Sequence, residues 1–227
     1  MDEKTFVNLL QKIFEQEGFL TQREVGVGYG VADLVVVKKS GINRKHCVIR
    51  KNHGQVYPLL SEEYFKALKL LPDENNQQTA VEFNYIAQKS ALSNSYLKYK
   101  ILRELETNGY IKRIEKKYYF KVNGWLPIAN ELVAIEAKLK DWRRGALQAN
   151  RYKAFANRVY LAVPQETTHL VDVAFLKEHN IGLISFDTKR QVKRIVVGCK
   201  PEKPFDEYKF YFAAEHFWSQ KQLVQTA

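Results

Sequence analysis

Cysteine is nearly absent from this chain: the only two among its 227 residues are Cys47 and Cys199. Two isolated cysteines provide neither a disulfide framework nor the paired spacing of a zinc site, which favours a reducing compartment. No apolar run approaches the roughly 20 residues that span a bilayer, and the charged N-terminal residues lead into an amphipathic segment and not an apolar signal core. We therefore expect a cytoplasmic protein that does not enter a membrane.

Acidic residues are too few to balance the basic ones. Lys and Arg together number 36 against 25 Asp and Glu, which gives a formal net charge of +11. A chain this basic is attracted to polyanions, and nucleic acid is the first candidate among them. The alternative is that the positive charge serves only to keep the protein in solution. The length allows one sizeable domain or two small ones.

Hydrophobic periodicity divides both ends of the chain into alternating helices and strands. We expect helices over residues 5–17, 142–156, 167–179 and 206–224. We expect strands over residues 19–27, 31–38, 45–50, 132–138, 158–163, 181–186 and 192–197. This alternation predicts an α/β fold with a mixed central sheet flanked by helices.

The middle of the chain has a different character. Helical spacing predicts helices over residues 61–71, 79–88 and 93–107, with a polar loop over 72–78. A hairpin with basic residues at its tip is expected over 110–114 and 117–122. The sequence thus predicts one discontinuous α/β domain, residues 1–57 and 125–227, interrupted by a helical unit over residues 58–124.

Three charged residues lie on two of the predicted strands of the α/β domain. Asp33 is near the start of the strand over 31–38, and Glu136 and Lys138 end the strand over 132–138. Residues two apart on a strand point to the same face, so Glu136 and Lys138 lie together. Charges on an apolar strand are costly unless they face a site. Two carboxylates suit a hard cation such as Mg²⁺, and a lysine suits a phosphate or an attacking water.

These residues resemble the signature of the PD-(D/E)XK nuclease superfamily, whose members have a restriction-endonuclease-like fold. Residues 30–33 (Gly-Val-Ala-Asp) are similar to the Gly-x-x-Asp element of its RecB-type branch. Residues 136–138 (Glu-Ala-Lys) match the (D/E)XK element. Residues 148–152 (Gln-Ala-Asn-Arg-Tyr) match the Gln-x-x-x-Tyr element on the following helix. The proline that often precedes the first acid is replaced by Ala32.

The resemblance implies a metal-dependent deoxyribonuclease that hydrolyses phosphodiester bonds. It implies that Asp33, Glu136 and the carbonyl of Ala137 bind Mg²⁺ or Mn²⁺, and that Lys138 orients water and offsets charge. It further implies that a helix face with Gln148 and Tyr152 is turned to the metal and the substrate backbone. The family also has an acid on its first helix, for which Glu3 and Glu17 both remain candidates. Two arginines that open the next helix, Arg143 and Arg144, are candidates for clamping phosphates or for a solvated helix start.

The inserted unit resembles a winged helix-turn-helix. The exposed face of its third helix carries hydroxyl, aromatic and basic side chains that suit a DNA groove: Ser95, Tyr96, Tyr99, Lys100 and Arg103. The hairpin would place basic residues on the DNA backbone: Lys112, Arg113, Lys116 and Lys117. Winged helices also serve protein contacts, and exposed tyrosines suit a protein interface as well.

Several alternatives remain open at this point. Asp33 could be a turn acid, Glu136 and Lys138 an ion pair at a sheet edge, and the Gln148–Tyr152 segment a helix surface. A catalytically inactive nuclease fold could bind DNA or assemble within a repair, restriction or mobile-element complex. The aromatic C-terminal segment could pack on the core or form a contact in a homodimer.

Overall fold

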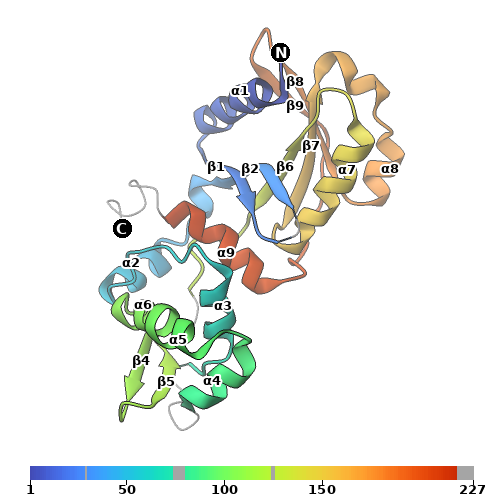
Figure 1. Cartoon of the computed structure of the whole chain (residues 1–227). Helices are drawn as coiled ribbons and strands as arrows, with labels where there is room; N and C mark the ends of the chain where they lie inside the picture. The colour runs from blue at the N-terminus through green and yellow to red at the C-terminus, as the bar shows by residue number, and fades with distance from the viewer. Residues whose placement is uncertain (29, 74–79, 124–125, 219–227) are drawn as a thin grey trace. The chain divides into compact units, whose positions relative to one another are not determined.

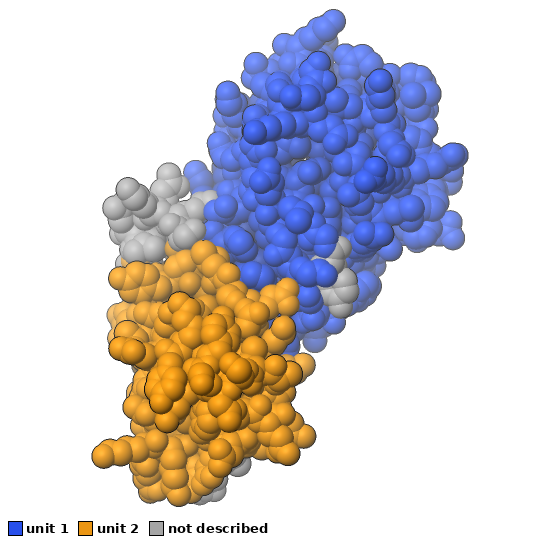
Figure 2. All heavy atoms as spheres, viewed as in Figure 1, with its two compact units in different colours: residues 1–42, 129–217 blue, residues 43–128, 218–227 orange. Residues whose placement is uncertain are grey.

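The computed structural model describes residues 1–28, 30–73, 80–123 and 126–218. The chain forms two compact units, coloured separately in Figure 2. Unit 1 comprises residues 1–42 and 129–217, and unit 2 comprises residues 43–128 and 218–227. An insertion therefore interrupts unit 1. Its boundaries lie at 42/43 and 128/129, outside the predicted limits of 58 and 124.

Unit 1 is built on a mixed sheet of six strands in the order β1-β2-β6-β7-β8-β9 (Figure 1). Strands β6, β7 and β8 are parallel neighbours, and all other neighbours in this sheet are antiparallel. The predicted mixed α/β class is confirmed. The strands are β1 (Phe19–Gly26), β2 (Val31–Lys38), β6 (Val133–Ala137), β7 (Arg158–Pro164), β8 (Gly182–Asp187) and β9 (Val192–Val197).

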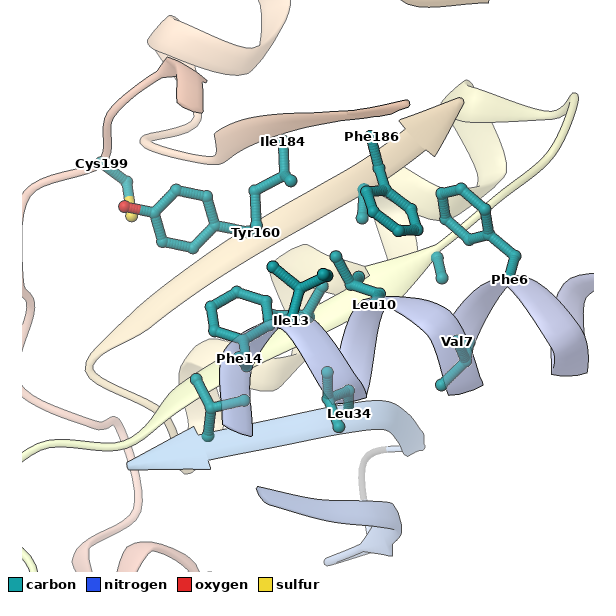
Figure 3. Packing of buried hydrophobic residues seen from close by; sticks show 14 residues of the cluster. Phe6, Val7, Leu10, Ile13, Phe14, Leu34, Tyr160, Ile184, Phe186 and Cys199 are labelled. Atoms are coloured by element: carbon teal, nitrogen blue, oxygen red, sulfur yellow. The ribbon is translucent and has the colours of Figure 1, made fainter. Parts of the chain in front are cut away.

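Helix α1 (Glu3–Gln16) covers one face of this sheet. Asp2 caps its start by accepting a hydrogen bond from the Thr5 amide at 2.7 Å. Its apolar stripe packs against inward-facing residues of β2, β6, β7 and β8 (Figure 3). Phe6, which is fully buried, meets Phe186 edge to face at 5.5 Å between ring centroids, a favourable aromatic geometry. This packing seals one side of the sheet.

Helix α7 (Trp142–Arg151) covers the other face and contacts β6 and β7 (Figure 1). Ile135 and Ala137 belong to the core under α1, so Glu136 between them points to the α7 side. The buried residues of α7 are small, which lets the helix approach the sheet closely: Gly145, Ala146 and Ala149. A short 3₁₀ turn (Tyr152–Ala154) follows it. The remaining helices are α8 (Val173–Glu178) and α9 (Glu207–Trp218), whose last residue belongs to unit 2.

Unit 2 contains helices and a small three-stranded antiparallel sheet in the order β3-β5-β4. A continuous helical run over residues 94–107 contains a π-helical stretch, Leu97–Leu102, and buries Leu97, Ile101 and Leu105. The predicted inward face of that helix is confirmed. The other elements are α2 (Arg44–Asn52), α3 (Glu62–Lys69), β3 (Val81–Glu82), α4 (Phe83–Ser90), β4 (Ile111–Ile114) and β5 (Tyr118–Lys121).

One element prediction was wrong, and two others were confirmed only in part. Residues 45–50 form α2 and not a strand, because Asn43 caps a helix by accepting from the His46 amide and the helix buries Cys47 and Arg50. In the predicted helix over 79–88, residues 81–82 instead pair with β5. The predicted helix over 167–179 is broken into a 3₁₀ segment (Gln165–Leu170) and α8, since Asp172 caps a new helix start.

Three predictions fall partly outside the described residues, namely the loop over 72–78, the start of the helix over 79–88 and the end of the helix over 206–224. None of the helices in the described ranges combines the length and apolar character that crossing a membrane requires.

Candidate active site

The candidate site forms where two neighbouring strands separate. The β2–β6 register ends with Leu34 opposite Ile135, and its continuation would place Asp33 opposite Glu136. β6 continues to pair with β7 as far as Ala137. In place of the next ladder bond, the Ala137 amide donates to Oδ2 of Asp33 at 2.8 Å. The end of one antiparallel pairing thus brings together two carboxylates that are about a hundred residues apart in sequence.

Glu136 is the centre of this cluster and is only 1% exposed. Its Oε1 lies 2.8 Å from Nζ of Lys138, and its Oε2 lies 2.5 Å from the hydroxyl of Tyr152. Lys138 Nζ also lies 3.5 Å from Oε2 of Glu3 on α1. The structure therefore brings together Asp33, Glu136, Lys138 and Tyr152, as the motif pattern predicts, and adds Glu3 to them.

The two candidates for the first-helix acid differ in their surroundings. Glu3 contacts Lys138 at the site, whereas Glu17 forms an ion pair with Lys193 of β9 at 2.6 Å. The two acids lie at opposite ends of α1, about 20 Å apart for a helix of this length. Of these two acids, Glu3 is the one that contacts the cluster.

Tyr152 joins two of the motif elements physically. Its hydroxyl lies within hydrogen-bonding distance of both Oε2 of Glu136 and the carbonyl of Val31, at 2.5 and 2.8 Å. Gly30 has a φ of 128°, and a Cβ there would lie 3.4 Å from Cε1 of Tyr152. A glycine suits this position because its backbone conformation is rarely accessible to other residues and the aromatic ring is close.

The hydroxyl of Tyr152 has one hydrogen and two acceptors near it. If Glu136 is ionised, only one of the two can receive that hydrogen. If Glu136 is protonated, it can donate to Tyr152 while Tyr152 donates to Val31. The local geometry therefore accommodates a protonated Glu136.

Burial raises the pKa of both carboxyl groups. For Asp33, the bond from the Ala137 amide and the charge of Lys138 offset only part of this effect. For Glu136, the bonds from Lys138 and Tyr152 oppose burial, and the negative charge of Asp33 adds to the rise in pKa. Burial alone would lower the pKa of Lys138, but its bond to Glu136 and the nearby acids outweigh burial and raise it. Lys138 is therefore a protonated ammonium at neutral pH.

The raised pKa of Asp33 predicts a pH-dependent change in stability. The folded chain holds this proton more tightly than the unfolded chain, so the contribution is present below the unfolded pKa of about 4 and is lost as pH rises through the raised folded pKa. Replacing Asp33 by asparagine keeps an acceptor for the Ala137 amide. We expect the Tm of Asp33→Asn relative to wild type to increase from pH 4 to pH 7 in thermal melts. A difference that stays constant over this range would contradict the pKa assignment.

Three other predicted residues lie on α7 and form no hydrogen bond or ion pair with the cluster within the described ranges. Gln148 is half-buried, and its Oε1 is buried without a hydrogen-bond partner among the described residues. Arg143 and Arg144 are exposed at the helix start, which Asp141 caps through the Arg144 amide at 3.1 Å. The Arg143 guanidinium stacks on the Trp142 ring at 5.2 Å from its centroid.

The residues predicted to bind DNA are exposed in unit 2. On the helical run over 94–107 these are Ser95, Tyr96, Tyr99, Lys100 and Arg103, and on the hairpin they are Lys112, Arg113, Lys116 and Lys117. Some of their charge is paired. Lys100 lies 2.5 Å from Glu104, Arg113 lies 3.3 Å from Glu106, and Lys117 lies 3.7 Å from Glu82. At the hairpin tip, Glu115 and Lys116 both have positive φ, as in the tight turns of β-hairpins.

Gly145 is a site residue that the sequence interpretation missed. A Cβ at this position of α7 would lie 2.6 Å from Cγ of Lys138 and 2.7 Å from Cδ1 of Leu161. The absence of a side chain at Gly145 therefore leaves room for the lysine. A glycine inside a predicted helix is costly and indicates close packing, so the signal was present in the sequence.

Across the described part of the chain, no three His, Cys, Asp or Glu side chains are gathered as a ready-made metal site. The oxygens of Asp33 and Glu136 nevertheless fit Mg²⁺, which proteins often hold through one or two carboxylates together with water and substrate phosphates. Comparisons with protein-family models, curated proteins and solved structures found no match for this chain. Functional inference therefore rests on the chain's own residues.

Proposed function

We propose that this chain is a metal-dependent DNA nuclease that hydrolyses phosphodiester bonds. One observation carries the proposal: the buried Glu136–Lys138 pair lies beside Asp33 where β2 and β6 separate. Structural ion pairs in sheets rarely need a second carboxylate next to them, because two acids in one buried place raise each other's pKa. A bound divalent cation would relieve the repulsion between the two carboxylates.

The fold and the motif elements support a restriction-endonuclease-like core. A helix precedes an antiparallel strand pair, and a strand, helix and strand follow in the order β6, α7, β7. Residues of the three motif elements meet at Glu136, since Tyr152 contacts Glu136 and packs close to Gly30. Cys47 and Cys199 are both buried and neither is in a disulfide, and we propose that this reflects a cytoplasmic environment.

Asp33 and Glu136, together with the carbonyl of Ala137, would hold Mg²⁺ or Mn²⁺. When bound, the ion lowers the pKa of a coordinated water and stabilises charge on the phosphate. The amide of Ala137 holds one oxygen of Asp33 at 2.8 Å, and the other oxygen accepts no hydrogen bond from the described residues. Asp33 is thereby oriented with one oxygen available as a ligand.

Lys138 would act on the substrate as a cation. Because its pKa is raised, it retains its proton at neutral pH and serves as a hydrogen-bond donor and not as a base. A fixed ammonium beside the reacting phosphate stabilises negative charge that develops in the transition state. Tyr152 holds Glu136 through its hydroxyl, and the raised pKa of Tyr152 keeps that phenol protonated.

We propose that unit 2 is a winged helix-turn-helix that positions DNA. Its strand order β3-β5-β4, with α4 and the helical run over 94–107 between β3 and β4, supports this assignment. The exposed face of the 94–107 run and the basic hairpin would contact the phosphate backbone, where positive charge provides most non-specific affinity. A homodimer or a larger DNA-processing complex is compatible with this role.

A DNA-binding protein that does not cut is the second candidate function. It is favoured by one observation, namely that both oxygens of Glu136 already have partners within the chain, Lys138 and Tyr152. Such a closed network could be purely structural. The two candidates differ in whether DNA is cleaved when a divalent cation is added.

Incubation with supercoiled and linear DNA tests the proposed function. We expect strand cleavage by wild type with Mg²⁺ or Mn²⁺ and none with EDTA. Binding without cleavage under all three conditions would support the non-cutting candidate. A protein that neither binds nor cleaves DNA would refute both.

Replacing Gly145 by alanine tests the position of Lys138 without removing it. The added Cβ lies 2.6 Å from Cγ of Lys138 and forces the side chain to move. A displacement of about 1 Å at a reacting centre can cost up to roughly 100-fold in rate, so we expect the cleavage rate to fall roughly 10- to 100-fold. The matched control is Gly41→Ala, since a Cβ there meets nothing within 4 Å. Equal rates for both variants would show that Lys138 does not act from its observed position.

A further inference from the structure

A surface pocket of about 490 Å³ lies within unit 2, on the helical run predicted to bind DNA. The segment over residues 57–59 forms one wall, and the second half of the helical run forms the other. Aromatic, basic, acidic and amide side chains share the lining: Tyr57, Tyr64, Tyr99, Arg103, Glu104 and Asn108. The exposed face of the helix thus borders a pocket at this point. A helix that binds in a DNA groove does not require such a pocket.

Two aromatic rings at this pocket are unusually exposed. Tyr57 is 63% exposed and Tyr99 is 65% exposed. The backbone of Tyr57 is fixed, because its carbonyl accepts a hydrogen bond from Tyr110 at 2.6 Å. Tyr99 belongs to the π-helical stretch, a rare conformation that is frequent at functional sites, and Nζ of Lys98 lies 5.3 Å from its ring centroid. Both rings therefore present aromatic surface from a supported backbone.

The polar groups of the pocket suit a nucleotide. Arg103 is exposed and forms no ion pair with any described residue, so its guanidinium is available to a phosphate. Glu104 is held by Lys100 and by the hydroxyl of Tyr64, and the bonds from these two groups lower its pKa. The side chain of Asn108 offers both a donor and an acceptor. Aromatic faces, a free guanidinium and an amide together are what proteins use to hold an unstacked base.

We propose that this pocket binds an unpaired nucleobase of a DNA substrate, with the base in contact with the rings of both Tyr57 and Tyr99 and an adjacent phosphate on Arg103. The inference rests on the proposed action on DNA, but it concerns recognition in unit 2 and not cleavage. It assigns the protein a preference for DNA with an overhang, a bulge or another unpaired position. Fully paired DNA would make only the backbone contacts.

The test measures binding in EDTA, where no cleavage is expected. Two duplexes of the same length are compared, one fully paired and one with a single extrahelical 2-aminopurine, whose fluorescence reports stacking. We expect wild type to bind the bulged duplex more tightly and to change the 2-aminopurine signal. Because stacking on an aromatic side chain contributes ~1–3 kcal/mol per base, Tyr57→Ala and Tyr99→Ala should each weaken binding of the bulged duplex by roughly fivefold or more.

Three comparisons make the result specific. Tyr99→Phe should retain the preference because it keeps the ring. Tyr85→Ala, which removes a tyrosine that is 45% exposed on α4, should behave as wild type. Affinity for the paired duplex should stay within about twofold of wild type in Tyr57→Ala and Tyr85→Ala, since the backbone contacts remain. Tyr99 lies on the helix face proposed to contact DNA, so Tyr99→Ala should lose more affinity for the bulged duplex than for the paired one.

Equal affinity of wild type for both duplexes would overturn the pocket assignment and leave the proposed nuclease function intact. An equal loss for both duplexes in Tyr99→Ala would also overturn it, because that pattern indicates a backbone contact. If wild type binds neither duplex, both the proposed DNA binding and the pocket assignment are refuted. Failure of the nuclease proposal itself is detected separately, by the absence of cleavage with Mg²⁺ or Mn²⁺.

Discussion

Replacing Glu136 by glutamine is expected to lower the rate of metal-dependent DNA cleavage by roughly 10²- to 10³-fold, the usual cost of removing one group that stabilises a charged transition state. Glutamine preserves the size of the side chain but removes its negative charge. We therefore expect weaker cation binding, and Lys138, which lies 2.8 Å from the carboxylate, keeps an oxygen acceptor but loses the negative charge beside it. Initial rates on linear DNA over a range of Mg²⁺ concentrations measure the effect.

The matched control for this prediction is Glu131→Gln. Glu131 also forms an ion pair, at 2.6 Å with Arg158, but it precedes β6 and lies far along the strand from Glu136. We expect its cleavage rate to equal that of wild type. Circular dichroism and thermal melts are used to test whether both variants are folded. A Glu136→Gln variant that is folded and cleaves at the wild-type rate would refute the assigned site.

Replacing Phe6 by alanine is expected to lower the free energy of unfolding by about 3–5 kcal/mol, the range for removing a buried aromatic side chain. Phe6 is fully buried between α1 and the sheet, and its ring meets Phe186 edge to face. The change leaves a cavity at the end of α1 that carries Glu3. Urea denaturation monitored by circular dichroism gives the difference from wild type.

Phe205→Ala serves as its control, because Phe205 is 78% exposed. Removing an exposed side chain changes stability by less than about 0.5 kcal/mol. A loss of similar size in both variants would mean that α1 does not seal the core as described.

The strands of unit 1 could be predicted because their apolar runs and turns are local signals. The strand over 31–38 was predicted at its observed limits. α2 could not be predicted in the same way, because its stability depends on distant partners. Arg50 is buried, with its guanidinium 4.6 Å from the Trp218 ring centroid and 2.5 Å from the Tyr110 hydroxyl. From sequence alone, a basic residue is predicted to be exposed. The burial of Arg50 against Trp218 and Tyr110 depends on the tertiary structure.

The main members of the candidate site could also be predicted, because the motif spacing implies a shared sheet end. The hydrogen bonds among these residues could not be predicted from the sequence. The bond from Ala137 to Asp33 depends on where the β2–β6 pairing stops, and no local pattern encodes that point. The contact of Glu3 with Lys138 depends on how α1 lies on the sheet. The two exposed tyrosines of the unit 2 pocket come from segments about 40 residues apart, so their proximity is likewise a property of the tertiary structure.

The chain leaves and re-enters unit 1 at neighbouring points, since Ile42 and Ala129 form an isolated antiparallel bridge. In topology, β2 and β6 are therefore the two strands of one antiparallel hairpin, and unit 2 is inserted in its loop. Asp33 lies at the start of β2 and Glu136 at the end of β6, so both acids are at the open end of this hairpin, away from the loop. The distance between the two acids therefore does not depend on the length of the inserted chain, and unit 2 can be lengthened or exchanged without moving the two carboxylates.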